Sequence, residues 1–449
     1  MDTDILIIGG GPSGVEAALT ASRYANHVTL VTKGNVCEWK AGYTNIFLAN
    51  VEEIKKHQSF SLPSVDNINK EWEVQQKNLL VNAGVQILFG TAAFQNSHSV
   101  KIVHDSGETT IITSKKIIIA NGSRPVFPES IQPDGKRIFS FRNLYEMNYI
   151  PASIIVIGDG PIGYEMVNLY IQLNIQVTWL LPEKRNQLFD EDITEYLISY
   201  YSNNGVKIER GTWVKELNNC GNIVRAVRED GKVFEAETAF ITLGFRSNLD
   251  QLQMEHANLQ MNHTGSIDSN PFGQSDNESI YIIGDARMPH SYTVTQALAM
   301  ARVATLHALN QNTDPIDPNT LPLAFNENPQ VATVGYVTTS NEEVDFIKVP
   351  YEKRNFRAFM DNKRDGFIKI VWNKDGTIIG GTCIGHQAKD IITTISLMIK
   401  LKATISQVQS FFGAHPSITE LPFFALRDRQ NQIQNEITCT VKSGRTCGK

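Results

Sequence analysis

The sequence of 449 residues lacks the features of several classes of protein. No apolar run approaches the roughly 18 residues that a membrane-spanning helix needs, and the first residues enter an apolar segment without the charged and apolar regions of a signal peptide. No block of basic residues is present, and 41 Lys and Arg against 47 Asp and Glu give a net charge of -6. We therefore expect a cytoplasmic protein that does not span a membrane and whose main partner is not a nucleic acid.

Cysteine is also scarce. The chain has five cysteines at scattered positions, and an odd number without regular spacing argues against a secreted disulfide framework and shows no zinc-ligand spacing. We therefore predict no metal site, and any cysteine chemistry has to be local. The five residues are Cys37, Cys220, Cys383, Cys439 and Cys447.

What the sequence does contain is a dinucleotide-binding pattern at its start. Residues 4–18 read DILIIGGGPSGVEAA, an apolar strand followed by a glycine turn and the start of a helix. Gly9 allows a sharp turn, Gly11 leaves room for a pyrophosphate to approach the backbone, and Gly14 lets the helix lie close to the strand. The N–H groups at the helix start then point at the phosphates. We expect contacts with the cofactor from Gly9, Gly11, Pro12, Ser13 and Gly14.

The strand that we predict over residues 28–32 ends with Thr32, and Lys33 follows it. In dinucleotide folds this place usually carries an acidic residue that binds the adenosine ribose. A hydroxyl makes fewer hydrogen bonds than a carboxylate, so we expect the nucleotide to fit here with a weaker contact.

Two further apolar strands end in turns that suit a ligand. The strand predicted over residues 116–119 runs into a turn with Ala120 and Gly122, and the strand over residues 280–283 is followed by Asp285. Ligands of open α/β sheets bind at the carboxyl ends of strands. A carboxylate at such an end can accept a hydrogen bond from a sugar hydroxyl.

The opening pattern returns at residues 154–165, which read IIVIGDGPIGYE, so two nucleotide-binding modules in one chain are the simplest interpretation. The second strand of such a module ends at the residue that selects between a free 2′-hydroxyl and a 2′-phosphate. Here Leu181 lacks the acid that favours NAD, while Lys184 and Arg185 could bind a phosphate that Glu183 would repel. Both NADH and NADPH therefore remain open.

The last third of the chain has a different character. A run rich in Pro and Asn over residues 310–323 indicates a linker. Beyond it, apolar segments predict several strands followed by two helices, without a glycine-rich nucleotide turn. We expect an α+β domain with a role in assembly, followed by a polar tail over residues 436–449 that contains Cys439 and Cys447.

In order and content these motifs resemble the pyridine nucleotide-disulphide oxidoreductases, the family that includes dihydrolipoamide dehydrogenase, glutathione reductase and mercuric reductase. The resemblance covers nearly the whole chain and rests on six segments. They are residues 9–14, the ANGSRP turn at 120–125, residues 158–165, GFRSN at 244–248, IGD at 283–285 and AHPSITE at 414–420.

The resemblance implies an α/β fold with two Rossmann-like dinucleotide-binding domains, the second inserted in the first, and a C-terminal α+β interface domain. The FAD-binding domain would take residues 1–148 and 245–318. The NAD(P)-binding domain would take residues 149–244, and the dimerisation domain residues 319–435.

The resemblance also implies the cofactors and their contacts. FAD would bind the first module, with Asp285 holding the ribityl chain, and NADH or NADPH would bind the second. The chain would form a homodimer in which His415, paired with Glu420, enters the partner subunit's flavin site as an acid and base. The implied FAD contacts are Gly9, Gly11, Pro12, Ser13, Gly14, Thr32, Lys33, Ala120, Gly122 and Asp285, and the implied NAD(P) contacts are Gly158, Gly160, Ile162, Gly163, Glu165 and Gly244.

The chain departs from the family where members that reduce disulfides carry two cysteines in the pattern Cys-x-x-x-x-Cys. Counted from Cys37, the second position falls on Gly42. The lysine that in the family pairs with the glutamate matching Glu165 is also missing, because Thr44, Asn45 and Ile46 stand in place of Pro-Ser-Lys. A single thiol cannot resolve its own mixed disulfide, so we expect no dithiol exchange through the usual pair.

We therefore expect a FAD-dependent NAD(P)H oxidoreductase that passes electrons from reduced flavin directly to a small acceptor, first of all a quinone in a diaphorase reaction. The alternatives are a soluble pyridine nucleotide transhydrogenase, a disulfide or metal reductase that uses the tail cysteines, and a sensor that keeps both cofactors without turnover. We interpret Cys37 either as an inert, buried thiol or as a residue that takes part in catalysis. The physiological acceptor stays open.

Overall fold

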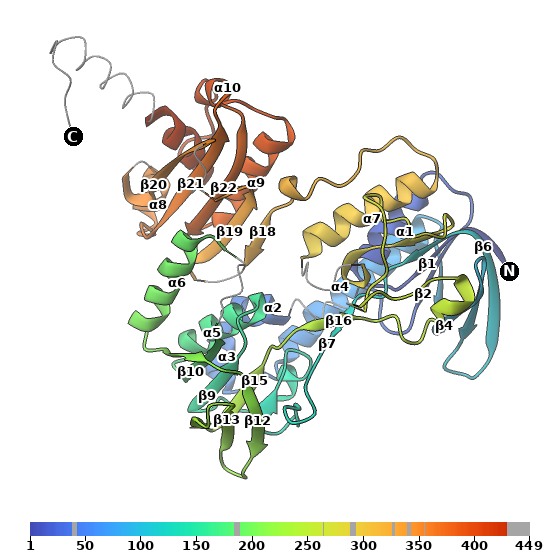
Figure 1. The fold of residues 1–449 in the computed structure, drawn as a ribbon, viewed down its shortest axis with the longest axis horizontal. Helices are drawn as coiled ribbons and strands as arrows, with labels where there is room; N and C mark the ends of the chain where they lie inside the picture. Colours follow the sequence, from blue (N-terminus) through green and yellow to red (C-terminus); the bar gives the residue numbers. More distant parts are fainter. Residues whose placement is uncertain are drawn as a thin grey trace. The chain divides into compact units, whose positions relative to one another are not determined.

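The computed structural model describes residues 1–37, 43–183, 189–263, 265–287, 293–325, 328–338, 343–353 and 355–428 (Figure 1). The chain divides into two compact units, Met1–Asn186 with Gly205–Ile316 and Gln187–Asn204 with Asp317–Lys449. None of the helices in the described ranges is long and apolar enough to cross a bilayer.

The first unit is built around a seven-stranded sheet. Strands β3, β2, β1 and β6 lie side by side in parallel, and β17 pairs with the end of β6. Strands β5 and β4 continue the sheet in antiparallel register from the first half of β6. The bounds are β1 Asp2–Ile8, β2 Val28–Thr32, β3 Gln86–Phe89, β4 Thr91–Asn96, β5 Ser99–Val103, β6 Thr109–Ile119 and β17 Ile280–Ile282.

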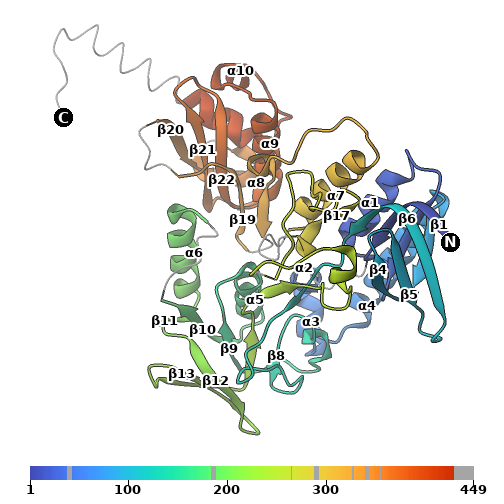
Figure 2. The same ribbon diagram turned by 45° about the vertical axis from the view of Figure 1, so that its right-hand side comes forward.

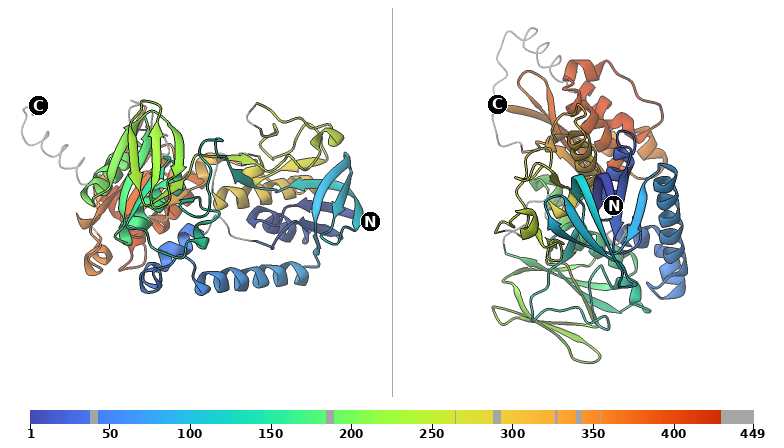
Figure 3. Two further views of the ribbon diagram at one scale, coloured as in Figure 1. Left: turned by 90° about the horizontal axis from the view of Figure 1, so that it is seen from below. Right: turned by 90° about the vertical axis from the view of Figure 1, so that its right-hand side faces the viewer.

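Strand β1 is buried on both of its faces. Ile5 and Ile7 pack into one core cluster with α1 and α7, whereas Leu6 and Ile8 pack into another, as the two-residue period of a strand requires. Parallel strands in α/β proteins are usually covered in this way. Helices α1 and α7 lie together on one face of the sheet, as Figures 1 and 3 show. The helices are α1 Pro12–Ala21, α2 Tyr43–Ala49, α3 Val51–His57, α4 Pro63–Asn82 and α7 Val294–Ala308.

A second parallel sheet in the same unit repeats this arrangement in the order β11-β10-β9-β15-β8, with helix α5 between β9 and β10 along the chain. A three-stranded antiparallel sheet, β12-β13-β14, and a two-stranded sheet, β7-β16, accompany it (Figure 2). The bounds are β7 Ser123–Pro125, β8 Ile138–Phe139, β9 Ser153–Ile157, α5 Pro161–Gln172, β10 Gln176–Pro182, β11 Lys207–Gly211, β12 Val214–Asn219, β13 Val224–Arg228, β14 Val233–Ala236, β15 Thr238–Ile241 and β16 Phe245–Ser247. The predicted fold class with two Rossmann-like modules is confirmed.

The second unit contains a five-stranded antiparallel sheet in the order β18-β19-β22-β21-β20. Helix α9 packs against β19 and β22, and its apolar face supplies Ile391, Ile392 and Ile395 to the core. This is the predicted α+β domain without a nucleotide turn. The bounds are β18 Leu323–Phe325, β19 Gln330–Gly335, β20 Val344–Pro350, α8 Phe356–Met360, β21 Gly366–Asn373, β22 Ile378–Gly385, α9 Ala388–Lys400 and α10 Ile405–Gln409.

Helix α6 (Glu191–Asn203), which the expected domain division assigns to the second nucleotide-binding module, groups with the second unit. A buried ion cluster holds it there. The Lys369 side chain on β21 is 2% exposed, and its ammonium pairs with Asp190, the residue that caps α6. The same ammonium lies 2.6 Å from the Asp192 carboxylate. Asp192 also pairs with Lys348 on β20. Burial alone would raise the pKa of Asp192, but the hydrogen bonds from Lys348 and Lys369 outweigh it and lower the pKa.

Replacing Lys369 with Met is expected to lower the free energy of unfolding by about 3 to 5 kcal/mol, because the Asp190 carboxylate stays buried without its cation. Lys374→Met is the matched control, since Lys374 pairs with Asp345 at an exposed place and should contribute about 1 kcal/mol or less. Urea unfolding followed by fluorescence gives both values.

The effect of Lys369 should also depend on pH. A carboxylate whose folded pKa is lowered, as that of Asp192 is, stabilises the fold above its unfolded pKa, and this contribution disappears as the pH falls through the folded pKa. The difference in the free energy of unfolding between wild type and Lys369→Met should therefore become smaller as the pH falls from about 5 towards about 3. If Lys369→Met and Lys374→Met lowered the free energy of unfolding equally at neutral pH, this role of the cluster would be contradicted.

Candidate functional site

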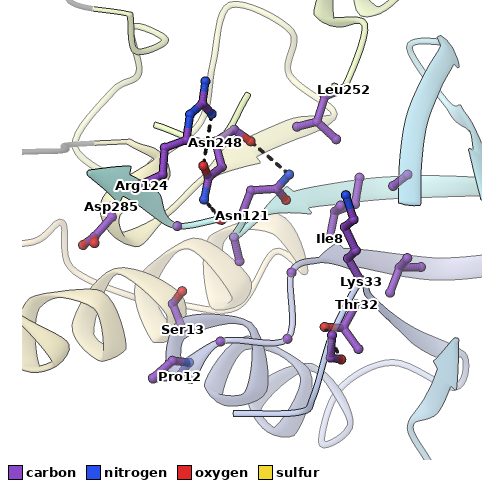
Figure 4. A pocket seen from close by; sticks show the side chains of 18 of the residues that line it. Ile8, Pro12, Ser13, Thr32, Lys33, Asn121, Arg124, Asn248, Leu252 and Asp285 are labelled. Carbon is purple, nitrogen blue, oxygen red and sulfur yellow. Dashed lines mark hydrogen bonds between the residues drawn. The ribbon is translucent and has the colours of Figure 1, made fainter. Parts of the chain in front are cut away.

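A cavity of about 720 Å³ lies at the carboxyl ends of β1, β2 and β6 in the first unit (Figure 4). Cavities of this size hold cofactors and drug-sized ligands. The lining includes Gly9, Gly11, Pro12, Ser13, Thr32, Lys33, Ala120, Gly122 and Asp285. The structure therefore places nine of the ten expected FAD contacts around one cavity, while the tenth, Gly14, does not line it.

The first glycine turn is tight on its protein side and open on its cavity side. A Cβ added to Gly9, whose φ is +117°, would lie 2.2 Å from the Ala120 carbonyl oxygen. One added to Gly14 would lie 1.8 Å from the Gly9 carbonyl oxygen, whereas one added to Gly11 would meet no atom within 4 Å. The chain itself therefore requires glycine at positions 9 and 14, and Gly11 leaves space for a ligand.

The start of α1 offers an anion site to this space. Pro12 begins the helix and Gly11 stands at its N-cap, so no side chain caps the first turn. The N–H groups of a first helical turn have no partner within the helix, and the helix dipole is positive there. Ser13 and Lys33 add a hydroxyl and a cation to the cavity wall, whereas Arg124 in the same wall is paired with Asp250. A pyrophosphate fits this arrangement.

The end of β2 offers fewer contacts to a ribose. The Thr32 hydroxyl donates a hydrogen bond to the Gly34 carbonyl oxygen at 3.1 Å. Its oxygen can still accept a bond from a ribose hydroxyl. The Lys33 ammonium lies 3.4 Å from the side-chain oxygen of Gln251. The weaker ribose contact expected from the sequence is consistent with this geometry.

Asp285 follows β17 and lines the same cavity. Its Oδ2 accepts a hydrogen bond from the Ser123 hydroxyl at 2.8 Å, whereas Oδ1 accepts none from any residue that the structure describes. Burial raises the pKa of Asp285, and the Ser123 hydrogen bond lowers it only in part. The remaining oxygen suits a hydroxyl-bearing chain. Sequence reasoning did not name Ser123 as a site residue, although it lies in the ANGSRP turn.

Two asparagines fix the turn between β6 and β7 (Figure 4). Nδ2 of Asn121 donates to the Asn248 carbonyl at 3.2 Å, and Nδ2 of Asn248 donates to the Asn121 carbonyl at 3.1 Å. Oδ1 of Asn121 is buried and has no hydrogen-bond partner among the described groups. Buried polar atoms of this kind usually find a ligand or a water molecule. Sequence reasoning placed Asn248 in the GFRSN segment but did not name it as a site residue.

The second glycine turn has the same construction as the first. Gly158 has a φ of +117°, and a Cβ there would lie 2.1 Å from the Thr242 carbonyl oxygen. A Cβ on Gly163 would lie 2.8 Å from the Gly158 carbonyl oxygen, and α5 again starts without a side-chain cap, behind Gly160. Ile162 and Glu165 belong to α5 itself, and Gly244 follows β15.

The end of β10 does not decide between NADH and NADPH. Leu181 is buried in the strand, and Glu183 beyond it is exposed. Lys184 and Arg185, which could bind a 2′-phosphate, lie outside the described residues.

Glu165 is buried, and its Oε2 accepts a hydrogen bond of 2.5 Å from the Thr44 hydroxyl. Thr44 lies on α2, which follows the segment that begins at Cys37. The contact joins the start of the second nucleotide-binding helix to the chain that leaves the first module. Sequence reasoning noted Thr44 only as a departure and did not predict this contact.

The three described cysteines are free thiols. Cys37 packs in the core beside α1, and burial raises its pKa, which the contact with Trp72 lowers only in part. Burial also raises the pKa of Cys383 to about 12, in spite of its hydrogen bond with Tyr351. Thiols of this kind are poor nucleophiles, which favours the inert interpretation of Cys37. Gly42, Cys439 and Cys447 lie outside the described residues.

Metal ligands do not gather in the ranges that the structure describes, since no group of three or more His, Cys, Asp or Glu side chains there could hold an ion.

In the second unit, His415 and Glu420 lie together. Nδ1 of His415 is 3.1 Å from Oε2 of Glu420, which also accepts the backbone N–H of Ser417 at 3.0 Å. Glu420 is buried, whereas the imidazole is 60% exposed and stacks on Phe356 with ring centroids 6.2 Å apart. A buried carboxylate thus orients an imidazole that is open to a second molecule.

Comparison with protein-family models identifies both parts of the chain. The model "Pyridine nucleotide-disulphide oxidoreductase" matches residues 3–307, and the dimerisation domain of the same family matches residues 321–422.

Curated relatives match over almost the whole length. An "NAD(P)H dehydrogenase (quinone)" of Mycobacterium tuberculosis is 26% identical, over 93% of this chain and 92% of the relative. A "Dihydrolipoyl dehydrogenase" of Geobacillus stearothermophilus is 28% identical, over 94% of this chain and 95% of the relative.

Solved structures share the fold. The crystal structure of LpdA from Mycobacterium tuberculosis superposes with a TM-score of 0.89 at 24% identity, covering 95% of this chain and 99% of that one. The Cu(II) complex of the HOCl-induced flavoprotein disulfide reductase RclA from Escherichia coli superposes with a TM-score of 0.85 at 18% identity. The match covers 96% of this chain and 100% of that one.

Gly11→Asp is expected to weaken FAD binding, whereas Gly14→Val is expected to destabilise the fold. Gly11→Asp should fold, because its Cβ meets open space, but bind FAD at least about 100-fold more weakly, because a carboxylate would face the pyrophosphate. Gly14→Val should lower the melting temperature of the apoprotein, because the new side chain meets the Gly9 carbonyl. Flavin absorbance after gel filtration and circular dichroism separate the two effects.

Ser106→Asp, on an exposed turn, is the control and should change neither quantity. Full retention of FAD by Gly11→Asp would show that the cofactor does not bind at this turn.

Proposed function

We propose that this chain, which belongs to the pyridine nucleotide-disulphide oxidoreductase family, is a quinone-reducing diaphorase without a dithiol relay. The family and the relatives make it a flavin-dependent NAD(P)H oxidoreductase with FAD and NAD(P)H as cofactors. The quinone and the direct route to it are the proposal.

The residues of the first cavity fit FAD. The open side of Gly11 and the start of α1 suit the pyrophosphate, Thr32 suits the adenosine ribose, and the free oxygen of Asp285 suits a ribityl hydroxyl. The turn before α5 would bind NAD(P)H in the same manner. When bound, FAD takes up a pair of electrons from NAD(P)H and can release them to a small acceptor.

The observation that carries the proposal is the environment of the thiols. Cys37 packs in the core of the first unit, Cys383 in that of the second, and Cys220 is exposed, and all three are free. A relay needs two thiols whose Cα atoms come within about 7 Å, with one of them reactive as a thiolate. The described cysteines offer no such pair, which supports reduction of the acceptor without thiol exchange.

The relatives support a quinone without deciding the question. The name "NAD(P)H dehydrogenase (quinone)" belongs to relatives at 26% identity, and the dihydrolipoyl dehydrogenases are just as similar. The environment of the thiols in this chain, rather than the sequence identities, favours quinone reduction over the dihydrolipoyl dehydrogenase reaction.

We propose further that the second unit forms a homodimer. The family match over residues 321–422 is a dimerisation domain. Seven of its large apolar side chains are more than half exposed, as in a surface that a partner subunit covers. They are Phe356, Phe359, Met360, Leu397, Leu401, Phe411 and Phe412. His415 stacks on the first of them, so its imidazole lies beside this surface and could give a proton to a quinone oxygen in the partner subunit's site.

Replacing His415 with Gln is expected to slow reoxidation of the reduced enzyme by a quinone about 10² to 10⁴-fold, because the acceptor oxygen loses its proton donor. Reduction by NAD(P)H and reoxidation by ferricyanide should change little, because neither step needs this proton. Stopped-flow absorbance measures the half-reactions separately.

His386→Gln is the matched control, since this histidine lies in the same unit, 4.0 Å from Asp361. A fall in both half-reactions, or dissociation seen by light scattering, would show that His415 is structural. Thio-NAD, lipoamide, oxidised glutathione and mercuric ion in the same assay test the other acceptors. Fast lipoamide turnover would contradict the proposal, and no turnover with any acceptor would favour a sensor.

A further inference from the structure

The contact between Thr44 and Glu165 lies where two segments that are distant in sequence meet. Thr44 belongs to α2, Glu165 belongs to α5, and 121 residues separate them. Thr44 is 2% exposed and Glu165 is 8% exposed, so solvent does little to hold either group in place.

The surroundings of this contact are apolar and closely packed. Phe47 of α2 meets Phe60 edge to face, Phe60 meets Tyr170 of α5, and Tyr170 meets Phe240 of β15, with centroids 5.6, 6.2 and 6.3 Å apart. All four rings are fully buried. The junction of α2 and α5 therefore has little freedom to move.

A carboxylate in such a place depends on its hydrogen bonds. Burial of an ionised group is costly unless donors face it, and a bond from a neutral donor to a carboxylate is stronger than one between neutral groups. The Thr44 hydroxyl supplies such a bond at 2.5 Å. Removing its donor should therefore change how the Glu165 carboxylate lies at the start of α5.

We propose that Thr44 is a positioning residue for the nicotinamide nucleotide: its hydroxyl holds the Glu165 carboxylate in the orientation in which the α5 turn binds NAD(P)H. Glu165 stands two residues after Gly163, within the first turns of the helix whose start forms the nucleotide turn. The inference rests on the assignment of this turn to NAD(P)H and not on the identity of the final acceptor. The Thr44 hydroxyl thus donates to the glutamate that, by the resemblance, matches the one paired with a lysine in the family.

A double-mutant cycle tests this role. Thr44→Val keeps the shape of the side chain and removes the donor, Thr44→Ser keeps the donor, and Glu165→Gln removes the charge. The dissociation constant for NAD⁺ or NADP⁺ is measured by calorimetry on the oxidised protein. The rate and KM of flavin reduction by NAD(P)H are measured by stopped flow, with no quinone present.

Thr44→Val is expected to raise the dissociation constant and the KM about tenfold, the usual effect of losing a hydrogen bond to a charged group. Thr44→Ser should stay within about threefold of wild type. The variant with both Thr44→Val and Glu165→Gln should match Glu165→Gln alone, because Thr44 acts through the carboxylate.

Independent, additive effects of the two substitutions would overturn the proposal, and so would nucleotide binding by Thr44→Val that equals wild type. Melting temperatures check the fold, and Thr44→Ala replaces Thr44→Val if the latter does not fold. No quinone enters this experiment. If the variants gave the expected non-additive effects but the wild-type protein did not reduce quinones, the proposed function alone would be overturned.

Discussion

The first module depends on a steric constraint at Gly9. The turn brings this residue against the Ala120 carbonyl and brings Gly14 against the Gly9 carbonyl, at distances that admit no Cβ atom. The end of β1, the end of β6 and the start of α1 can therefore meet without side chains between them. No side chain caps the first turn of α1, and the same constraint at Gly158 and Thr242 builds the second turn. The same steric constraint at two glycine turns thus shapes both nucleotide sites of the proposed enzyme.

The parts that could be predicted from the sequence are those that depend on local spacing. Glycine turns after apolar strands locate the modules, and an acid after an apolar strand singled out Asp285. The contacts that orient these residues could not be predicted, because their partners are distant in the chain: Ser123 lies 162 residues from Asp285, and Thr44 lies 121 residues from Glu165.

The same reason explains why α6 was not foreseen in the second unit. Lys369 stands in an apolar strand whose pattern predicts burial, but no pattern shows that its partners, Asp190 and Asp192, come from a helix start about 180 residues earlier. The sequence analysis also predicted no strands over β11 to β14, which are only four to six residues long and each carry at least one charged side chain.

The departures of this chain from its family gather between Cys37 and Ile46, while both glycine turns keep their geometry. This division has a chemical consequence. A flavin carries the redox step by itself, and the protein has to bind, orient and supply protons. Loss of the thiol pair would therefore change which acceptor is reduced without removing the oxidoreductase chemistry.

The central claim, that no dithiol takes part, can be tested most directly by counting electrons. The purified FAD protein is titrated anaerobically with dithionite while the flavin absorbance is followed. FAD takes up two electrons, and a redox-active disulfide would take up two more. We predict that the titration ends at two electrons per FAD. An endpoint of four would show that a cysteine pair, including Cys439 and Cys447 of the tail, stores the second pair of electrons, and would contradict the account.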